Sequence, residues 1–219
     1  MHIDAVIFDC DGVLVDSEPI TNRVLTTMLN ELGLGFDLAQ TMRTFMGRAL
    51  RDELAIIEAL TGRPLPPDWY AGFARRRDEA LAHEVKAVAG IETVLDALDR
   101  AGRPYAVASG ADRAKMRLTL GTTGLLRRFE TTGSRLFGAD MVERAKPAPD
   151  VYRLAARSLG VDPTRCAVVE DTPAGTTAGV AAGSRVLGFC AHTDPRALLA
   201  AGAVAVFDDM QHLPALLGL

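Results

Sequence analysis

Lysine is scarce in this chain: among 219 residues it occurs only at Lys86, Lys115 and Lys146, beside 21 arginines. A reaction that depends on a lysine ammonium group therefore has few candidates. Aromatic residues make up only 5% of the chain, and the formal net charge is −4, with acidic and basic residues interspersed. Because the chain has no basic stripe, we expect no nucleic acid among its partners.

Long apolar runs are also missing, and we expect no leader segment. No run approaches the roughly 18 apolar residues that span a membrane, and Met1 leads directly into a strand-like run. We expect no membrane partner, a cytoplasmic location, and a monomer or weak homodimer. The cysteines are odd in number and lie in or beside apolar runs, which favours small buried thiols over disulfides at Cys10, Cys166 and Cys190.

The first motif that indicates chemistry lies where the apolar run from Ile3 to Phe8 gives way to Asp9, Asp11 and Gly12. Carboxylates directly after a buried strand are costly unless something uses their charge. Ligands of open α/β sheets bind at the carboxyl ends of the strands, so the two aspartates lie where a site is expected. An ordinary Asp-Gly turn gives the same local pattern, and this motif alone does not decide between the two.

Two more carboxylates, Glu170 and Asp171, follow the apolar run 166–169. If they meet Asp9 at one edge of a sheet, uncompensated like charges would push protons onto one another. A cluster of hard oxygen ligands is typical of a magnesium site, so Mg²⁺ is the expected cofactor.

Two other segments offer groups that bind phosphate. Ser109 and Gly110 follow the apolar run 105–108, and a hydroxyl beside a backbone N–H suits phosphate oxygens. Lys146 stands in Lys-Pro-Ala-Pro-Asp, where the prolines restrict its backbone. A fixed ammonium group suits the charge on phosphoryl oxygens. Taken alone, a lysine in a loop is more often solvated.

The order of elements predicts the fold. From about residue 17 to 87 only helical patterns occur. From about residue 88 onward, helices alternate with short strands, which we place at 103–108, 166–169, 185–189 and 203–207, with another near 129–132. This alternation is typical of an α/β fold with a doubly wound, mainly parallel sheet. We predict a Rossmann-like core of residues 1–16 and 88–219, interrupted by an all-helical insert over 17–87.

Together the motifs at Asp9-Cys10-Asp11-Gly12, Ser109, Lys146 and Glu170-Asp171 resemble the haloacid dehalogenase superfamily, in this order and over nearly the whole chain. Members of that superfamily mostly transfer phosphoryl groups through an aspartyl phosphate. The resemblance implies that the insert is a mobile helical cap, which closes over the active site and carries substrate specificity. Closure of such a lid would exclude water from the phosphoryl transfer.

The same resemblance implies a role for each carboxylate. Asp9 would be the nucleophile and a metal ligand, and Asp11 would give its backbone carbonyl to the metal. Asp171 would give a carboxylate, and Glu170 would bind the metal directly or through water. The Asp11 side chain can also protonate the leaving alcohol and later deprotonate the attacking water.

The remaining candidates would bind the substrate. Lys146, Ser109 and Gly110 would hold the phosphoryl group. The loop Met46-Gly47-Arg48 resembles the superfamily's specificity loop, and Arg48 could hold a second anionic group of the substrate through paired hydrogen bonds. A surface arginine without function is the alternative for Arg48. The run Arg75-Arg76-Arg77 is more typical of a solvated helix face than of an anion site.

Three features help to choose among the activities of the superfamily. Dehalogenases of the superfamily lack an acid at the position of Asp11, because a halide leaving group needs no proton. The presence of Asp11 therefore disfavours dehalogenation. Phosphonoacetaldehyde hydrolases need a lysine in the cap, and none precedes Lys86. β-Phosphoglucomutases carry a histidine twelve residues after the nucleophile, where this chain has Thr21.

We therefore predict a magnesium-dependent phosphatase that acts on a small phosphorylated metabolite. The sequence is similar to the 6-phosphogluconate phosphatase group, which implies a sugar phosphate or a sugar-acid phosphate as the substrate. A β-phosphoglucomutase-like phosphomutase is the alternative activity. A non-catalytic protein that binds a phosphorylated metabolite on the same fold is the alternative from another class.

Overall fold

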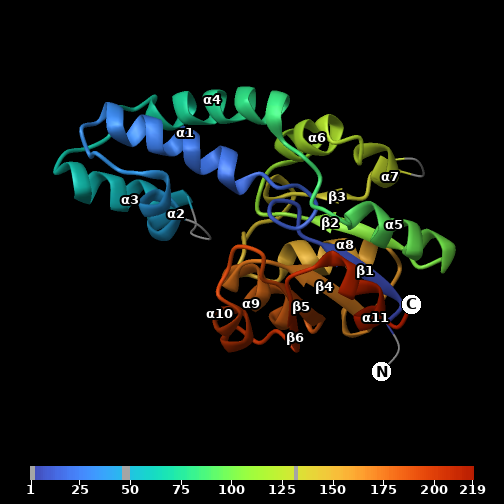
Figure 1. The fold of residues 1–219 in the computed structure, drawn as a ribbon. Helices are drawn as coiled ribbons and strands as arrows, with labels where there is room; N and C mark the ends of the chain where they lie inside the picture. The colour runs from blue at the N-terminus through green and yellow to red at the C-terminus, as the bar shows by residue number, and fades with distance from the viewer. Residues whose placement is uncertain (1–2, 46–49, 131–132) are drawn as a thin grey trace. The chain divides into compact units, whose positions relative to one another are not determined.

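The computed structural model describes residues 3–45, 50–130 and 133–219, without the side chains of residues 50–52. The chain divides into two compact units (Figure 1). The first unit comprises Met1–Asp16 and Lys86–Leu219, and the second comprises Ser17–Val85.

The first unit is built on a six-stranded parallel sheet with the strand order β3-β2-β1-β4-β5-β6. The strands are β1 (Ala5–Phe8), β2 (Tyr105–Ala108), β3 (Leu136–Phe137), β4 (Cys166–Glu170), β5 (Arg185–Phe189) and β6 (Ala205–Phe207). The chain adds strands on one side of β1 and then returns to add β4 on its other side. This doubly wound order confirms the predicted fold class.

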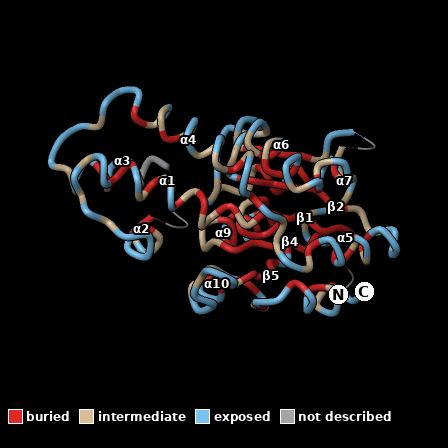
Figure 2. Tube along the Cα trace, turned by 45° about the horizontal axis from the view of Figure 1, so that its top comes forward, coloured by how far each residue is buried: buried red, intermediate tan, exposed pale blue. Residues whose placement is uncertain are grey.

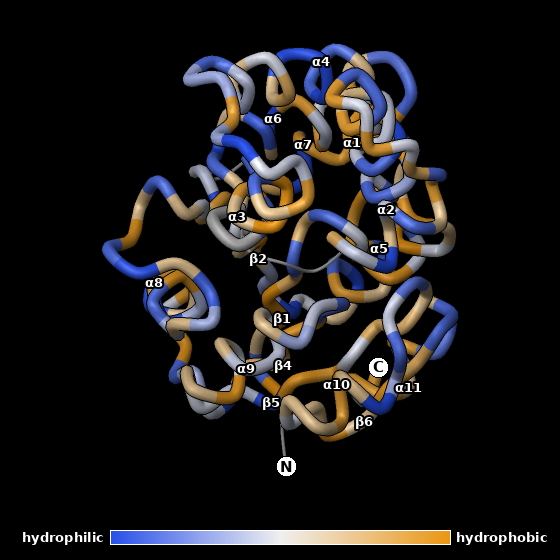
Figure 3. Tube along the Cα trace, turned by 90° about the vertical axis from the view of Figure 1, so that its left-hand side faces the viewer, coloured by the Kyte–Doolittle hydropathy of each residue, from blue (hydrophilic) through white to orange (hydrophobic). Residues whose placement is uncertain are grey.

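Helices connect the strands and cover the sheet. They are α5 (Ile91–Arg100), α6 (Arg113–Thr122), α7 (Leu126–Glu130), α8 (Asp150–Ser158), α9 (Pro173–Ala182), α10 (Pro195–Ala200) and α11 (Leu213–Leu217), with the short 3₁₀ segments η1 (Ala139–Met141), η2 (Pro163–Arg165) and η3 (Met210–His212). Helix α8 carries both hydrophilic and hydrophobic residues (Figure 3), as expected of a helix that packs on a sheet.

One face of the sheet packs against α8 and α9. Ala5 and Ile7 of β1 share a buried core with Tyr152 and Ala155 of α8. On the other face, the ring of Phe8 lies 6.4 Å from that of Tyr105, measured between centroids. Because both faces are covered, the central strands are buried along their whole length (Figure 2), which explains their continuous apolar sequences.

The second unit is helical in the residues that the structure describes. Its helices are α1 (Glu18–Glu31), α2 (Leu38–Phe45), α3 (Leu50–Thr61) and α4 (Trp69–Glu84). They enclose a core of their own, in which Leu29, Phe45 and Phe73 are buried. Asp37 and Gln40 accept hydrogen bonds from each other's backbone N–H groups, a capping box that begins α2.

The prediction of a strand near residues 129–132 is wrong for residues 129 and 130, which the structure describes. Phe129 lies in α7, and the strand follows later as β3. The helix is favoured because it turns Phe129 onto Tyr105, where the two rings meet edge to face with centroids 5.4 Å apart. Residues 131 and 132 lie outside the described residues.

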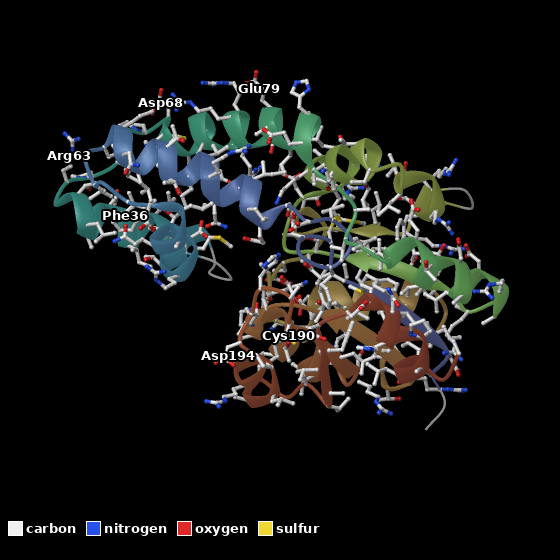
Figure 4. The ribbon with its side chains drawn as sticks, viewed as in Figure 1. Phe36, Arg63, Asp68, Glu79, Cys190 and Asp194 are labelled. Atoms are coloured by element: carbon white, nitrogen blue, oxygen red, sulfur yellow. The ribbon has the colours of Figure 1, made fainter. Side chains whose placement is uncertain are left out.

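All three cysteines are free thiols, as the sequence predicts. Cys10 and Cys166 are buried as predicted, whereas Cys190, labelled in Figure 4, is only partly buried and places its sulfur 3.3 Å from the carbonyl oxygen of Phe207. Within the described residues, no helix is both long and apolar enough to cross a membrane.

Candidate active site

Asp9, Ser109 and Asp171 lie at the carboxyl ends of the central strands, where the winding of the sheet changes direction. Asp9 comes directly after β1, and its N–H donates to the carbonyl oxygen of Val169 in β4 at 2.9 Å. Ser109 comes directly after β2, and its N–H donates to Phe137 of β3 at 2.9 Å. The sheet ladders thus fix the backbones of both residues, at the position where open α/β sheets bind their ligands.

Lys146 joins these strand ends. Its Nζ donates to Oδ1 of Asp9 at 2.6 Å, to Oε1 of Glu170 at 2.7 Å and to the carbonyl oxygen of Ala108 at 3.0 Å. All three donors of the ammonium group are therefore used. The Lys146 side chain is 9% exposed, so the alternative of a solvated loop lysine is wrong.

Glu170 is held from several directions. Its Oε1 accepts hydrogen bonds from Lys146 and from the Tyr152 hydroxyl, the latter at 2.9 Å. Its Oε2 accepts from the backbone N–H of Thr172 at 2.8 Å and from the Thr172 hydroxyl at 2.9 Å. Protein donors thus take up about four lone-pair directions, which is what a carboxylate offers. This arrangement fixes Glu170 as a support for Lys146.

Asp9, Glu170 and Asp171 form a buried acidic cluster. One carboxylate oxygen from each lies within 4.8 Å of the others, a spacing that could hold a metal ion. Close packing leaves little freedom for Asp171, because a Cβ added at Gly12 would meet its Oδ2 at 2.1 Å. Gly12 has a φ of +75°, in the left-handed region, so both its conformation and its surroundings require glycine.

The cluster shifts the proton affinity of its members. Burial raises the pKa of Asp9 to about 7, and the charge of Glu170 adds to this shift while that of Lys146 opposes it. Burial alone would lower the pKa of Lys146, but Asp9 and Glu170 hold it well above its ordinary value. Burial alone would raise the pKa of Glu170, but Lys146 and the hydrogen bonds lower it. The site therefore favours an additional positive charge beside Asp9.

Lys115 lies at the site, although the sequence did not single it out. Its Nζ donates to Oδ2 of Asp11 at 2.9 Å, from the first turn of α6. The scarcity of lysine could have indicated Lys115, because a chain with only three lysines offers few cations of this kind for a site. Both lysines that follow Ser109 in the chain bind a carboxylate of the Asp9–Gly12 turn.

The remaining candidates differ in what can be said of them. The Ser109 side chain is buried and its Oγ accepts from the N–H of Ala111 at 3.0 Å, while a Cβ added at Gly110 would meet nothing within 4 Å. A substrate can therefore approach the Gly110 backbone closely. Arg48 lies outside the described residues.

The arginine run at 75–77 is only partly the solvated helix face that the sequence predicts. Arg76 is exposed and pairs with Glu31. Arg77 is only 14% exposed, pairs with Asp78 and lies over the ring of Phe73, so the prediction is wrong for Arg77.

A family model described as a haloacid dehalogenase-like hydrolase matches residues 3–183. The chain belongs to this family. It is 32% identical to a 6-phosphogluconate phosphatase of Escherichia coli, over 98% of this chain and 95% of that protein. It is 34% identical to a fructose-1-phosphate phosphatase of the same species, over 81% of this chain and 92% of that protein.

Among solved structures, a β-phosphoglucomutase-like protein of Thermotoga maritima has a TM-score of 0.80 at 26% identity, and the match covers 99% of this chain and all of that one. The phosphatases among the relatives identify this haloacid dehalogenase-like hydrolase as a phosphatase, so the prediction of an enzyme is confirmed.

Gly175 allows this hydrolase to hold Glu170 in place. It lies in the first turn of α9, where a Cβ would meet Oε1 of Glu170 at 1.6 Å. We expect Gly175→Ala to destabilise the protein by about 1–3 kcal/mol, because the added methyl group must displace a fully hydrogen-bonded carboxylate. Urea unfolding followed by circular dichroism measures this change.

Gly121→Ala is the matched control for Gly175→Ala. Gly121 lies in α6, and a Cβ there would meet its nearest neighbour, Leu126, at an ordinary 3.9 Å. This control should stabilise the protein by roughly 0.5–1 kcal/mol, the usual gain of alanine over glycine inside a helix. If both variants are stabilised, Gly175 is not required by its contact with Glu170.

Proposed function

We propose that this phosphatase hydrolyses a sugar phosphate or sugar-acid phosphate with Mg²⁺, through an aspartyl phosphate on Asp9. The observation that carries the proposal is the Asp9 carboxylate, fixed at the end of β1 and bound to Lys146 inside a buried acidic cluster. A carboxylate can attack phosphorus, but its negative charge repels an anionic ester unless cations stand beside it. Lys146 is one such cation.

The residues present fit a magnesium ion as the other cation. Asp9 and Asp171 would hold it with carboxylate oxygens and Asp11 with its backbone carbonyl, since hard oxygen ligands suit Mg²⁺. Protein donors already bind both oxygens of Glu170. Glu170 would therefore contribute its negative charge, or would bind the ion through a water molecule. Such an ion supplies positive charge that stabilises phosphoryl oxygens in the transition state.

The chain's own residues would carry out two displacements. In the first, an Asp9 oxygen attacks phosphorus, the bond from phosphorus to the leaving oxygen breaks, and Asp11 gives that oxygen a proton. In the second, Asp11 takes a proton from water, the water oxygen attacks phosphorus, and the bond to Asp9 breaks to release phosphate. The positive charge of Lys146 would attract the phosphoryl oxygens, and the Ser109 hydroxyl and the Gly110 N–H would donate hydrogen bonds to them.

Substrate choice would lie with the helical unit, which we propose acts as a lid. Arg48 is the residue proposed to bind a second anionic group, such as the carboxylate of a sugar acid. The relatives that act on 6-phosphogluconate and fructose 1-phosphate support a substrate of this class.

A panel of phosphate esters tests the proposal. We expect the wild-type protein to release phosphate from 6-phosphogluconate and from fructose 1-phosphate faster than from nucleotides. Release should stop in EDTA and return when excess Mg²⁺ is added, because Asp9 would otherwise repel the ester.

The same panel includes β-glucose 1-phosphate, with glucose 6-phosphate formation measured beside phosphate release. Conversion of this ester without phosphate release would replace the phosphatase by a phosphomutase. Binding of the esters without turnover of any of them would indicate a protein that only binds phosphorylated metabolites. Release that persists in EDTA would contradict the role proposed for magnesium.

A further inference from the structure

We propose that Lys115 is a positioning residue, which holds the Asp11 carboxylate in the place where it exchanges protons with the leaving group and with water. The inference rests on the proposed function and deepens it. It starts from one contact: Nζ of Lys115 lies 2.9 Å from Oδ2 of Asp11, between side chains that are 15% and 18% exposed.

Each of the two lysines of the site binds a different aspartate of the Asp9–Gly12 turn. Lys146 binds Asp9 and not Asp11 among the contacts described, whereas Lys115 binds Asp11. A carboxylate that must act as nucleophile and one that must act as acid and base need different places around one phosphorus atom. Binding to separate ammonium groups, on α6 and after η1, keeps these carboxylates apart.

Helix α6 contacts the Asp9–Gly12 turn at a second point. Thr119 lies one helical turn after Lys115, on the same face, and its Oγ1 is 3.9 Å from the sulfur of Cys10. Cys10 stands between the two aspartates and is buried, as is Thr119. The face of α6 that carries Lys115 therefore packs against the Asp9–Gly12 turn, whose Asp11 carboxylate Lys115 binds.

The start of α6 is anchored, so the Lys115 backbone is fixed. The Asp112 side chain caps the helix by accepting from the N–H of Lys115 itself at 2.8 Å. Arg113 donates from its backbone to Oδ1 of Asp140 at 3.2 Å and from its Nε to Oδ2 at 2.9 Å. Gly138 completes this junction, since a Cβ there would meet the carbonyl oxygen of Ala111 at 2.8 Å.

Stability alone does not explain a lysine at this position. Lys115 is the third residue of α6, where the helix dipole disfavours a positive charge. The pair with Asp11 is mostly buried, and the desolvation of both ions offsets their attraction. Residues that break a local rule in this way are expected at functional sites. The use of the charge is therefore to orient Asp11.

The leaving-group dependence of the reaction tests the role of Lys115. In Lys115→Met, which keeps the length of the side chain without its charge, a misplaced Asp11 should slow esters that need a proton on the leaving oxygen. We expect kcat/KM for 6-phosphogluconate, or for the sugar phosphate that ranks first in the panel, to fall about 10- to 100-fold. For p-nitrophenyl phosphate, whose leaving oxygen needs little protonation, kcat/KM should change less than about 3-fold.

Matched variants separate this role from a structural one. Arg117→Met removes an exposed cation of the same helix, paired with Glu130, and should leave both rates unchanged. Lys115→Arg restores the charge and should recover most of the rate with the sugar phosphate. Thermal unfolding of every variant reports whether it folds, and Lys115→Gln serves as the uncharged variant if Lys115→Met does not.

The outcomes distinguish the two proposals. Equal losses with both esters, or no loss with either, in an active protein would overturn the role of Lys115 and leave the phosphatase mechanism standing. A wild-type protein that releases phosphate from neither ester would overturn the proposed function, and the role of Lys115 with it.

Discussion

Replacing Asp9 with asparagine should lower phosphatase activity by roughly 10⁴-fold or more, because losses of this size follow the removal of a covalent nucleophile. The substitution keeps the shape of the side chain and one oxygen that can accept from Lys146, so the local contacts should survive. Phosphate release from the best ester of the panel measures the loss. Acid quenching of the wild-type reaction, followed by mass spectrometry, should show one added phosphoryl group on Asp9, which is absent from the variant.

The folded state of Asp9→Asn needs a separate check. Burial raises the pKa of Asp9 to about 7, so the ionised form is costly in the folded protein and its replacement by a neutral amide should not unfold the protein. Thermal unfolding close to that of the wild type is the expected control result. A folded variant that still turns over within tenfold of the wild-type rate would exclude Asp9 as the nucleophile.

Replacing Lys146 with methionine should damage both activity and stability. The substitution leaves Asp9 and Glu170 buried without their shared cation, with side chains that are 9% and 1% exposed. Removing one partner of a buried ion pair costs about 3–5 kcal/mol, and we expect a loss of that size in urea unfolding with EDTA present. Activity of the folded fraction should fall roughly 10²- to 10³-fold, since a fixed cation at the phosphoryl group is lost.

Lys86→Met is the control for this substitution. Lys86 is exposed, and the same change there removes a charge without leaving a buried carboxylate unpaired. Its stability should stay within about 0.5 kcal/mol of the wild type. If Lys146→Met is no less stable than Lys86→Met, the bonds from Lys146 to Asp9 and Glu170 do not support the site.

Much of the fold could be predicted from the sequence, because its elements follow local periodicity. Short apolar runs predicted the strands β1, β2, β4 and β5. The error at α7 has the opposite cause. Five residues are too few for a period to be recognised, and the helix there depends on the contact of Phe129 with Tyr105, which lies far away in the chain.

The placement of the candidate residues was predicted where it depends on position after a strand. Asp9, Ser109 and Asp171 each directly follow a buried strand, so parallel pairing brings them to one edge. Tyr152 was not predicted, because it looks like an ordinary core residue of an amphipathic helix. Its hydroxyl bond to Glu170 becomes visible only when α8 packs against β1 and β2.

The sequence by itself determined which groups are proposed for the chemistry of this phosphatase: the carboxylates at the ends of β1 and β4, the lysine among prolines and the order of strands that gathers them. Only the tertiary structure decided how they are paired. Lys115 and Asp11 are 104 residues apart, and Lys146 and Asp9 are 137 apart. Side-chain periodicity reports which face a residue lies on, but not which residue from a distant element will meet it. The packing of the elements around the sheet determines these partners, so that Lys146 binds Glu170 and Lys115 binds Asp11.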